Sequence, residues 1–153
     1  MNKPLLIENA RIIDPASNAD FTGAVLIENG RISDIVEGKA PGAPDKAETI
    51  DAKGLVLAPG LIDMRVFTGE PGHEYRETLK SAGRAAAAGG VTSILVMPDT
   101  QPVIDNSALV EFIARHAEAT TCVNVLPTAA ITTGTEGKDL TEFGLLKEAG
   151  AVC

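Results

Sequence analysis

The sequence predicts an α/β fold in which a small β unit precedes the first strand and helix units of a parallel sheet. Two observations support this prediction. Short strand-like runs separated by an Asn29-Gly30 turn fill the N-terminal region, and from residue 59 onward strand patterns alternate with helix patterns. Such alternation is typical of a parallel sheet covered by helices.

Residues 1–58 are expected to form a small β-sandwich unit. Its strand-like runs are residues 5–7, 24–28, 31–36 and 49–51. Asn29-Gly30 supplies the positive φ angles of a type I′ turn, so the second and third runs should pair as a hairpin. Residues 38–46 carry two prolines and two glycines and are predicted to form an exposed loop.

Residues 59–153 are predicted to contain three strand-helix units and the start of a fourth strand. The predicted strands are residues 61–67, 91–97, 122–126 and 151–153, and the predicted helices are residues 77–88, 107–120 and 139–149. Gly89-Gly90 should end the first helix, and Asn106 can cap the second. Three units cannot close a barrel of eight strands. We therefore expect a fragment of a longer polypeptide, or a chain whose open sheet edges are covered by another chain.

Composition and charge argue against several classes of function. The 153 residues are 44% hydrophobic and carry a net charge of −8, with no cluster of lysine and arginine. A phosphate backbone would be repelled, so nucleic acid is not an expected partner. No apolar run approaches a membrane span and no signal peptide is evident, so we expect a cytoplasmic protein without a membrane partner. Cys122 and Cys153 are expected to be buried small hydrophobic residues.

The most informative segment is residues 59–72, Pro-Gly-Leu-Ile-Asp-Met-Arg-Val-Phe-Thr-Gly-Glu-Pro-Gly. Arg65 and Phe67 lie two residues apart, so their side chains should share one face at the end of the predicted strand. A guanidinium stays protonated and a phenyl ring has no lone pair, so neither binds Zn²⁺. No His-x-His, His-Glu-x-x-His or Cys-x-x-Cys pattern occurs in the sequence. His73 is interpreted as an exposed loop residue, and His116 as a helix-packing residue.

Further motifs are distributed along the whole chain. They are residues 58–63, 70–72, 84–92, 97–100, 102–105 and 144–151. Through these motifs the chain resembles the N-terminal third of the dihydroorotase family of the amidohydrolase superfamily. Glu-Pro-Gly combined with Met-Pro-x-Thr is specific to dihydroorotases and their nearest relatives. The resemblance implies the N-terminal part of a TIM-type (β/α)8 metallo-amidohydrolase barrel, preceded by the β-sandwich unit.

The resemblance also implies a chemistry from which this chain departs at four positions. Enzymes of the family interconvert carbamoyl aspartate and dihydroorotate in pyrimidine biosynthesis, and use zinc to activate a water and polarise the amide carbonyl. Arg65 and Phe67 stand in place of two metal-binding histidines. Gly69 replaces an arginine, and Asp99 an asparagine, that contact the substrate carboxylate. The family's other ligands and its general base come from later strands.

We therefore predict no catalytic residue, no metal ligand and no cofactor in this chain. Its similarity to dihydroorotase-like proteins that lack the zinc ligands implies an assembly partner of aspartate transcarbamoylase. The alternative is an active dihydroorotase or related cyclic-amide hydrolase that takes metal ligands from downstream sequence, with Asp63 or His73 recruited locally. Hydrolysis of another cyclic amide, from a substrate without the carboxylate, is a third alternative.

Arg65 and Phe67 also have interpretations that involve no function. Arg65 either pairs with a carboxylate, Glu70 or Asp99, or is partly solvated at the barrel rim. Phe67 is expected to fill the core rather than to stack on a ligand.

Overall fold

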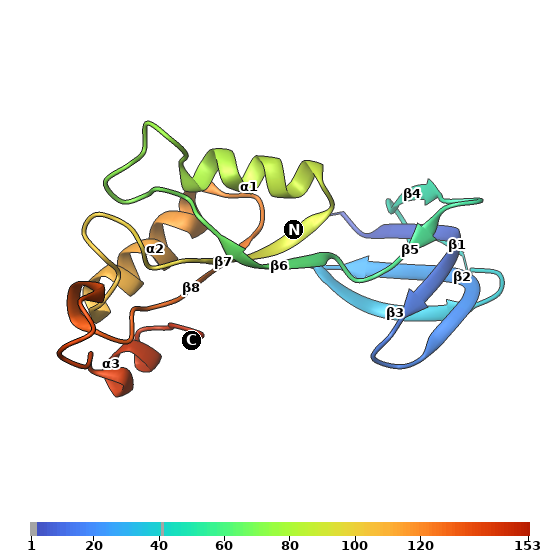
Figure 1. Cartoon of the computed structure of the whole chain (residues 1–153). Helices are drawn as coiled ribbons and strands as arrows, with labels where there is room; N and C mark the ends of the chain where they lie inside the picture. The colour runs from blue at the N-terminus through green and yellow to red at the C-terminus, as the bar shows by residue number, and fades with distance from the viewer. Residues whose placement is uncertain (1–2, 41) are drawn as a thin grey trace. The chain divides into compact units, whose positions relative to one another are not determined.

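The computed structural model describes residues 3–40 and 42–153, which fold into two compact units (Figure 1). The first unit ends at Pro59 and the second begins at Gly60. Each has a hydrophobic core of its own. Pro41, within the loop expected at residues 38–46, lies outside the described residues, as do Met1 and Asn2.

The N-terminal unit is a sheet of five strands. They are β1 (Leu5–Asp14), β2 (Ala19–Glu28), β3 (Arg31–Glu37), β4 (Glu48–Asp51) and β5 (Val56–Leu57). The spatial order is β3-β2-β1-β4, and β5 also pairs with β1. β2 is antiparallel to both β1 and β3, whereas β4 and β5 run parallel to β1. The predicted hairpin between β2 and β3 is confirmed, because Asn29 and Gly30 turn the chain with φ of 52° and 75°.

Alternation along β1 separates an apolar face of this sheet from a charged one. The buried core residues are Ala10, Ile12, Val25 and Ala52. Arg11 lies between two of them in sequence, so its side chain points to the opposite face. There its guanidinium forms two hydrogen bonds with the Asp20 carboxylate on β2, at 2.7 and 2.6 Å. This pairing holds the pKa of Asp20 below its usual value.

The C-terminal unit is a parallel sheet of three strands with helices in the connections. The strands are β6 (Leu61–Val66), β7 (Val91–Val96) and β8 (Asn124–Pro127), in that spatial order, and the helices are α1 (Leu79–Ala88), α2 (Ser107–Thr120) and α3 (Phe143–Glu148), with a 3₁₀ turn, η1 (Thr133–Thr135). This arrangement confirms the predicted α/β class. No helix among the described residues is long and apolar enough to cross a membrane.

The core of this unit lies between β7 and the helices. Its buried residues are Leu79, Ile94, Val96, Ile104, Val110, Ile113, Ala117 and Leu146. Ile94 and Val96 alternate along β7 and therefore share one face, while Val110, Ile113 and Ala117 repeat every three or four residues along α2. This packing fixes α2 against the sheet.

Local hydrogen bonds explain where the elements differ from the predicted ranges. α1 begins at Leu79 rather than at residue 77, because Thr78 and Ser81 form a capping box. α3 begins only at Phe143. The residues before it are tied to the segment after β8, where the Thr141 hydroxyl donates to the Ala130 carbonyl at 2.8 Å. The strand predicted at 151–153 does not form. Those residues are joined to β8 and the segment after it by two backbone hydrogen bonds, from the Val152 N–H to the Pro127 carbonyl and from the Ala129 N–H to the Cys153 carbonyl.

Candidate functional site

The residues singled out by the sequence lie where β6 and β7 end. Arg65 is near the end of β6, Phe67 follows it, and Gly69 lies in the loop that leads to α1. Asp99 lies in the loop after β7. The Met97 N–H donates to the Val66 carbonyl at 2.9 Å, so the two strand ends are neighbours. This is the end of a parallel sheet at which α/β proteins place their sites.

Arg65 lies within a bulge of β6. Asp63 and Val66 pair with Ile94 and Val96 of β7, so Met64 and Arg65 of β6 lie opposite the single residue Leu95. The Asp63 carboxylate accepts a hydrogen bond from the Arg65 N–H at 3.0 Å. Bulges re-aim side chains and are common next to sites.

Arg65 and Phe67 contact each other. The guanidinium carbon lies 5.4 Å from the centroid of the Phe67 ring, a cation–π arrangement. Phe67 is 52% exposed in this structure, so the prediction that it fills the core is wrong. Arg65 is exposed and, in the part of the chain that the structure describes, forms no ion pair with Glu70 or Asp99. Of the two interpretations of Arg65, the structure agrees with a solvated guanidinium, which here also contacts an aromatic ring.

Gly69 occupies a conformation that favours glycine. Its φ is 70°, and a Cβ at this position would lie 2.8 Å from the His73 carbonyl oxygen. The His73 N–H also donates to the Gly69 carbonyl, at 2.6 Å, which closes the turn. The loop backbone is therefore fitted to the absence of a side chain at this position.

Glu70 is buried and contacts both α1 and α2. One carboxylate oxygen accepts a hydrogen bond from the Leu79 N–H at 2.7 Å, and the other lies 2.8 Å from Nε2 of His116 on α2. His116 also stacks on Phe112, with 5.6 Å between ring centroids. The prediction of helix packing for His116 is therefore incomplete, because the imidazole is an electrostatic partner of Glu70. No local sequence pattern links two residues so far apart in the chain.

The loops after β6 and β7 are in close contact. The Gln101 N–H donates to the Pro71 carbonyl at 3.0 Å. Gly72 has a φ of 96°, and a side chain there would collide with the Gln101 carbonyl. The Gly72 N–H donates to the Glu74 carboxylate at 2.9 Å and lowers the pKa of that group. Asp99 is exposed and forms no ion pair within the described residues.

The donors near this site do not fit a zinc ion. Across residues 3–40 and 42–153, no group of three or more His, Cys, Asp and Glu side chains is placed to hold a metal. His73 is half-buried rather than exposed and lies edge-on to Tyr75, at 5.9 Å between centroids. Cys122 and Cys153 are both exposed, so the prediction that they are buried is wrong. Neither the guanidinium of Arg65 nor the ring of Phe67 can donate an electron pair to zinc.

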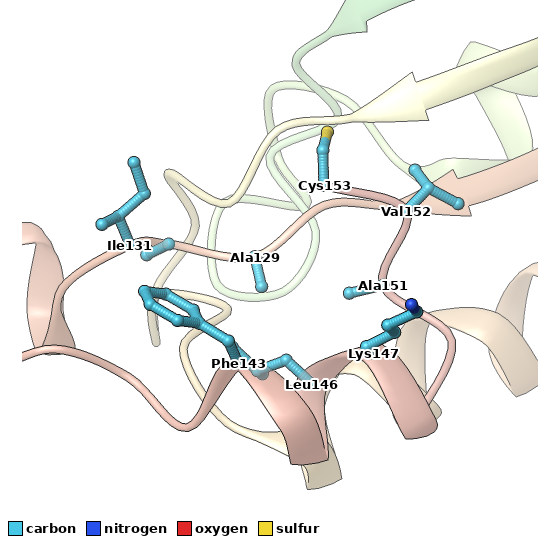
Figure 2. Close-up of a pocket in the computed structure, with 9 residues that line it drawn as sticks. Ala129, Ile131, Phe143, Leu146, Lys147, Ala151, Val152 and Cys153 are labelled. Atoms are coloured by element: carbon cyan, nitrogen blue, oxygen red, sulfur yellow. The ribbon is translucent and has the colours of Figure 1, made fainter.

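The pocket drawn in Figure 2 is separate from these positions. It has a volume of about 380 Å³ and lies between the segment after β8 and α3. Phe143, Leu146 and Val152 contribute to its mostly apolar lining, with Lys147 at one side. Its lining contains none of Arg65, Phe67, Gly69 and Asp99.

Comparison with known proteins identifies the family. The profile described as "Dihydro-orotase-like" matches residues 54–153. The chain belongs to the dihydro-orotase-like family. It is 49% identical over 148 residues to a dihydroorotase of Geobacter metallireducens, and 49% identical over 150 residues to one of Solibacter usitatus. Each alignment covers 97% of this chain and 34% of the relative. The chain thus spans about a third of the length of the curated relatives it matches.

Solved structures show the same fold at low sequence identity. L-hydantoinase from Arthrobacter aurescens matches with a TM-score of 0.83 and 23% identity, over 99% of this chain and 32% of that protein. D-hydantoinase from Thermus sp. matches with a TM-score of 0.69 and 24% identity, over 94% of this chain and 30% of that protein. The predicted fold, a β unit followed by the first part of an amidohydrolase barrel, is thereby confirmed.

Proposed function

We propose that this member of the dihydro-orotase-like family does not catalyse the dihydroorotase reaction and acts in pyrimidine biosynthesis as an assembly partner of aspartate transcarbamoylase. The observation that carries the proposal is the contact between Arg65 and Phe67, at the two positions where the family resemblance places histidine ligands. We also propose that the protein is located in the cytoplasm.

The chemistry at the strand ends supports the loss of catalysis. A bound zinc would supply an activated water and polarise the amide carbonyl. Arg65 offers a permanent positive charge to the same space and would repel a divalent cation. Asp99 is an exposed carboxylate where the resemblance places a substrate-binding amide, so it would repel a substrate carboxylate. Both effects act against the family reaction.

The loop at Gly69 supports the same proposal independently. An arginine in that position would pair with a carboxylate through two hydrogen bonds, and glycine removes that contact. Because the Gly69 backbone is in the left-handed region and lies against His73, an arginine could not be accommodated without moving the loop. The surrounding scaffold nevertheless keeps its buried core and its paired Glu70. A scaffold retained without its site supports a role that depends on surface or stability.

The experiment uses the full-length protein co-expressed with the aspartate transcarbamoylase of the same organism. We expect the two to co-migrate in size-exclusion chromatography, and transferase assembly to fail without the dihydroorotase-like chain. Ring opening of dihydroorotate should stay at background whether or not zinc is added. Robust zinc-dependent activity, or an assembled transferase in the absence of this chain, would contradict the proposal.

A second candidate function is an active dihydroorotase or related cyclic-amide hydrolase. The specific support is 49% identity, over 97% of this chain, to a protein called dihydroorotase. Metal ligands would then come from downstream sequence, with Asp63, which is exposed, or the half-buried His73 as a local contributor. An activity abolished by Asp63→Asn and by a chelator, but unaffected by Arg65→Leu, would favour this candidate.

A further inference from the structure

The Glu70 carboxylate lies where three segments of the C-terminal unit meet. It belongs to the loop after β6, and its side chain is 10% exposed. One oxygen accepts a hydrogen bond from the Leu79 N–H at the start of α1, and the other lies 2.8 Å from Nε2 of His116 on α2. The loop is thus held to both helices through a single side chain.

A buried carboxylate depends strongly on such donors. Removing one partner of a buried charged group leaves it unsatisfied, which costs more than an ordinary hydrogen bond contributes. The Leu79 N–H belongs to the first turn of α1, where backbone donors and the helix dipole favour an anion. Among the ion pairs of the described residues, Glu70 is joined to His116 alone.

His116 also reaches the outer surface of α2. Its side chain is 37% exposed, and its ring lies parallel to that of Phe112, which is 41% exposed. The interplanar angle is 5°, so rotation of the imidazole would disrupt the stack. The ring that binds Glu70 is therefore oriented by a neighbour on the outer face of the helix.

We infer that Glu70 and His116 form a latch that couples the outer face of α2 to the loop after β6. With the latch closed, the imidazole is stacked on Phe112 and the loop is fixed to both helices. A change at the Phe112 and His116 face that turns the imidazole away opens the latch and releases the loop that carries Gly69. This coupling does not depend on whether the protein is an enzyme.

Amide hydrogen exchange in the full-length protein tests the latch. We expect His116→Leu to raise the exchange rates of the His73 and Leu79 amides by about 10-fold or more, the effect of losing one polar contact to a buried carboxylate. Phe112→Ala should have a smaller effect on the same amides, because the imidazole keeps its donor and loses only its orientation. Arg115→Leu is the matched control on α2, because its 4.0 Å pair with Glu111 is exposed. It should leave both amides unchanged.

Amides of β7 supply the reference for global stability. Faster exchange confined to the loop and the start of α1 supports the latch, whereas equal acceleration in β7, or no acceleration anywhere, overturns it. If His116→Leu does not fold, the wild-type protein still decides the question. The His116 Nε2 proton should be visible by NMR as slowly exchanging and close to the loop after β6, and its absence would overturn the inference.

Discussion

The guanidinium of Arg65 lies over the ring of Phe67, 5.4 Å from its centroid. The two side chains contact each other, and both are exposed. An arrangement of this kind is held weakly, because exposed cation–π pairs contribute about 0.5–1 kcal/mol.

Arg65→Leu should therefore change the free energy of unfolding by no more than about 1 kcal/mol. Chemical denaturation of the full-length protein measures this. Ile94→Ala is the comparison, since Ile94 is buried in the core of the same sheet and its truncation should cost about 2–5 kcal/mol. A loss for Arg65→Leu as large as for Ile94→Ala would mean that the arginine has a buried partner.

Gly69→Ala should destabilise the protein by about 1–3 kcal/mol, because an L-residue at φ 70° is strained and its Cβ would crowd the His73 carbonyl. Gly144→Ala is the matched control. Gly144 is in α3 and nothing lies within 4 Å of its Cβ position, so alanine should stabilise by about 0.5–1 kcal/mol. In thermal unfolding we expect Gly69→Ala to lower the unfolding midpoint and Gly144→Ala to raise it. Equal effects would show that the loop at Gly69 is not constrained.

Asn106→Ala should cost about 1 kcal/mol of stability, because the Asn106 side chain accepts a hydrogen bond from the Leu109 N–H at 3.1 Å and caps α2. Asn106→Asp should preserve most of the stability, since a carboxylate accepts the same bond and favours the helix dipole. Circular dichroism during thermal unfolding compares the two. Similar losses for both variants would contradict the capping role.

Acid should remove the contribution of the Arg11 and Asp20 pair. The hydrogen bond from Arg11 lowers the pKa of Asp20 below its ordinary value of 3.8, so the unfolded chain takes up the proton first as pH falls. The contribution of the pair to the free energy of unfolding is fully present above pH 3.8. It is lost as the pH falls through the lower pKa that Asp20 has in the folded protein. Arg11→Leu should therefore lower the unfolding midpoint at neutral pH and have no effect in strong acid. Arg31→Leu, which removes no ion pair among the described residues, should show no such dependence.

Patterns close in sequence predicted much of the fold. The range of α2 agrees with the prediction at both ends, because Asn106 is a strong capping signal next to a helical apolar repeat. The hairpin at Asn29 and Gly30 also agrees, because its turn chemistry is local. α3 is shorter than predicted, since Leu140 forms an antiparallel bridge with Thr132 and the Thr141 N–H donates to the Ile131 carbonyl, which keeps this segment out of the helix.

The site was harder to predict, because its contacts join distant segments. Spacing placed Arg65 and Phe67 on one face, but the exposure of Phe67 depends on its surroundings and not on its own pattern. The pairing of Glu70 with His116 depends on the packing of α2 against the loop after β6, which no local pattern contains. No local pattern predicted the positive φ of Gly69 or the close approach of the His73 carbonyl to it.

The most direct test of the central claim is the zinc content of the full-length protein, purified from zinc-supplemented cells and dialysed before elemental analysis. We predict far less than one zinc per chain for the wild type, and an increase for the variant carrying Arg65→His and Phe67→His, whose imidazoles restore two possible ligands at the end of β6. One tightly held zinc per wild-type chain, with ring opening of dihydroorotate that depends on it, would contradict the account.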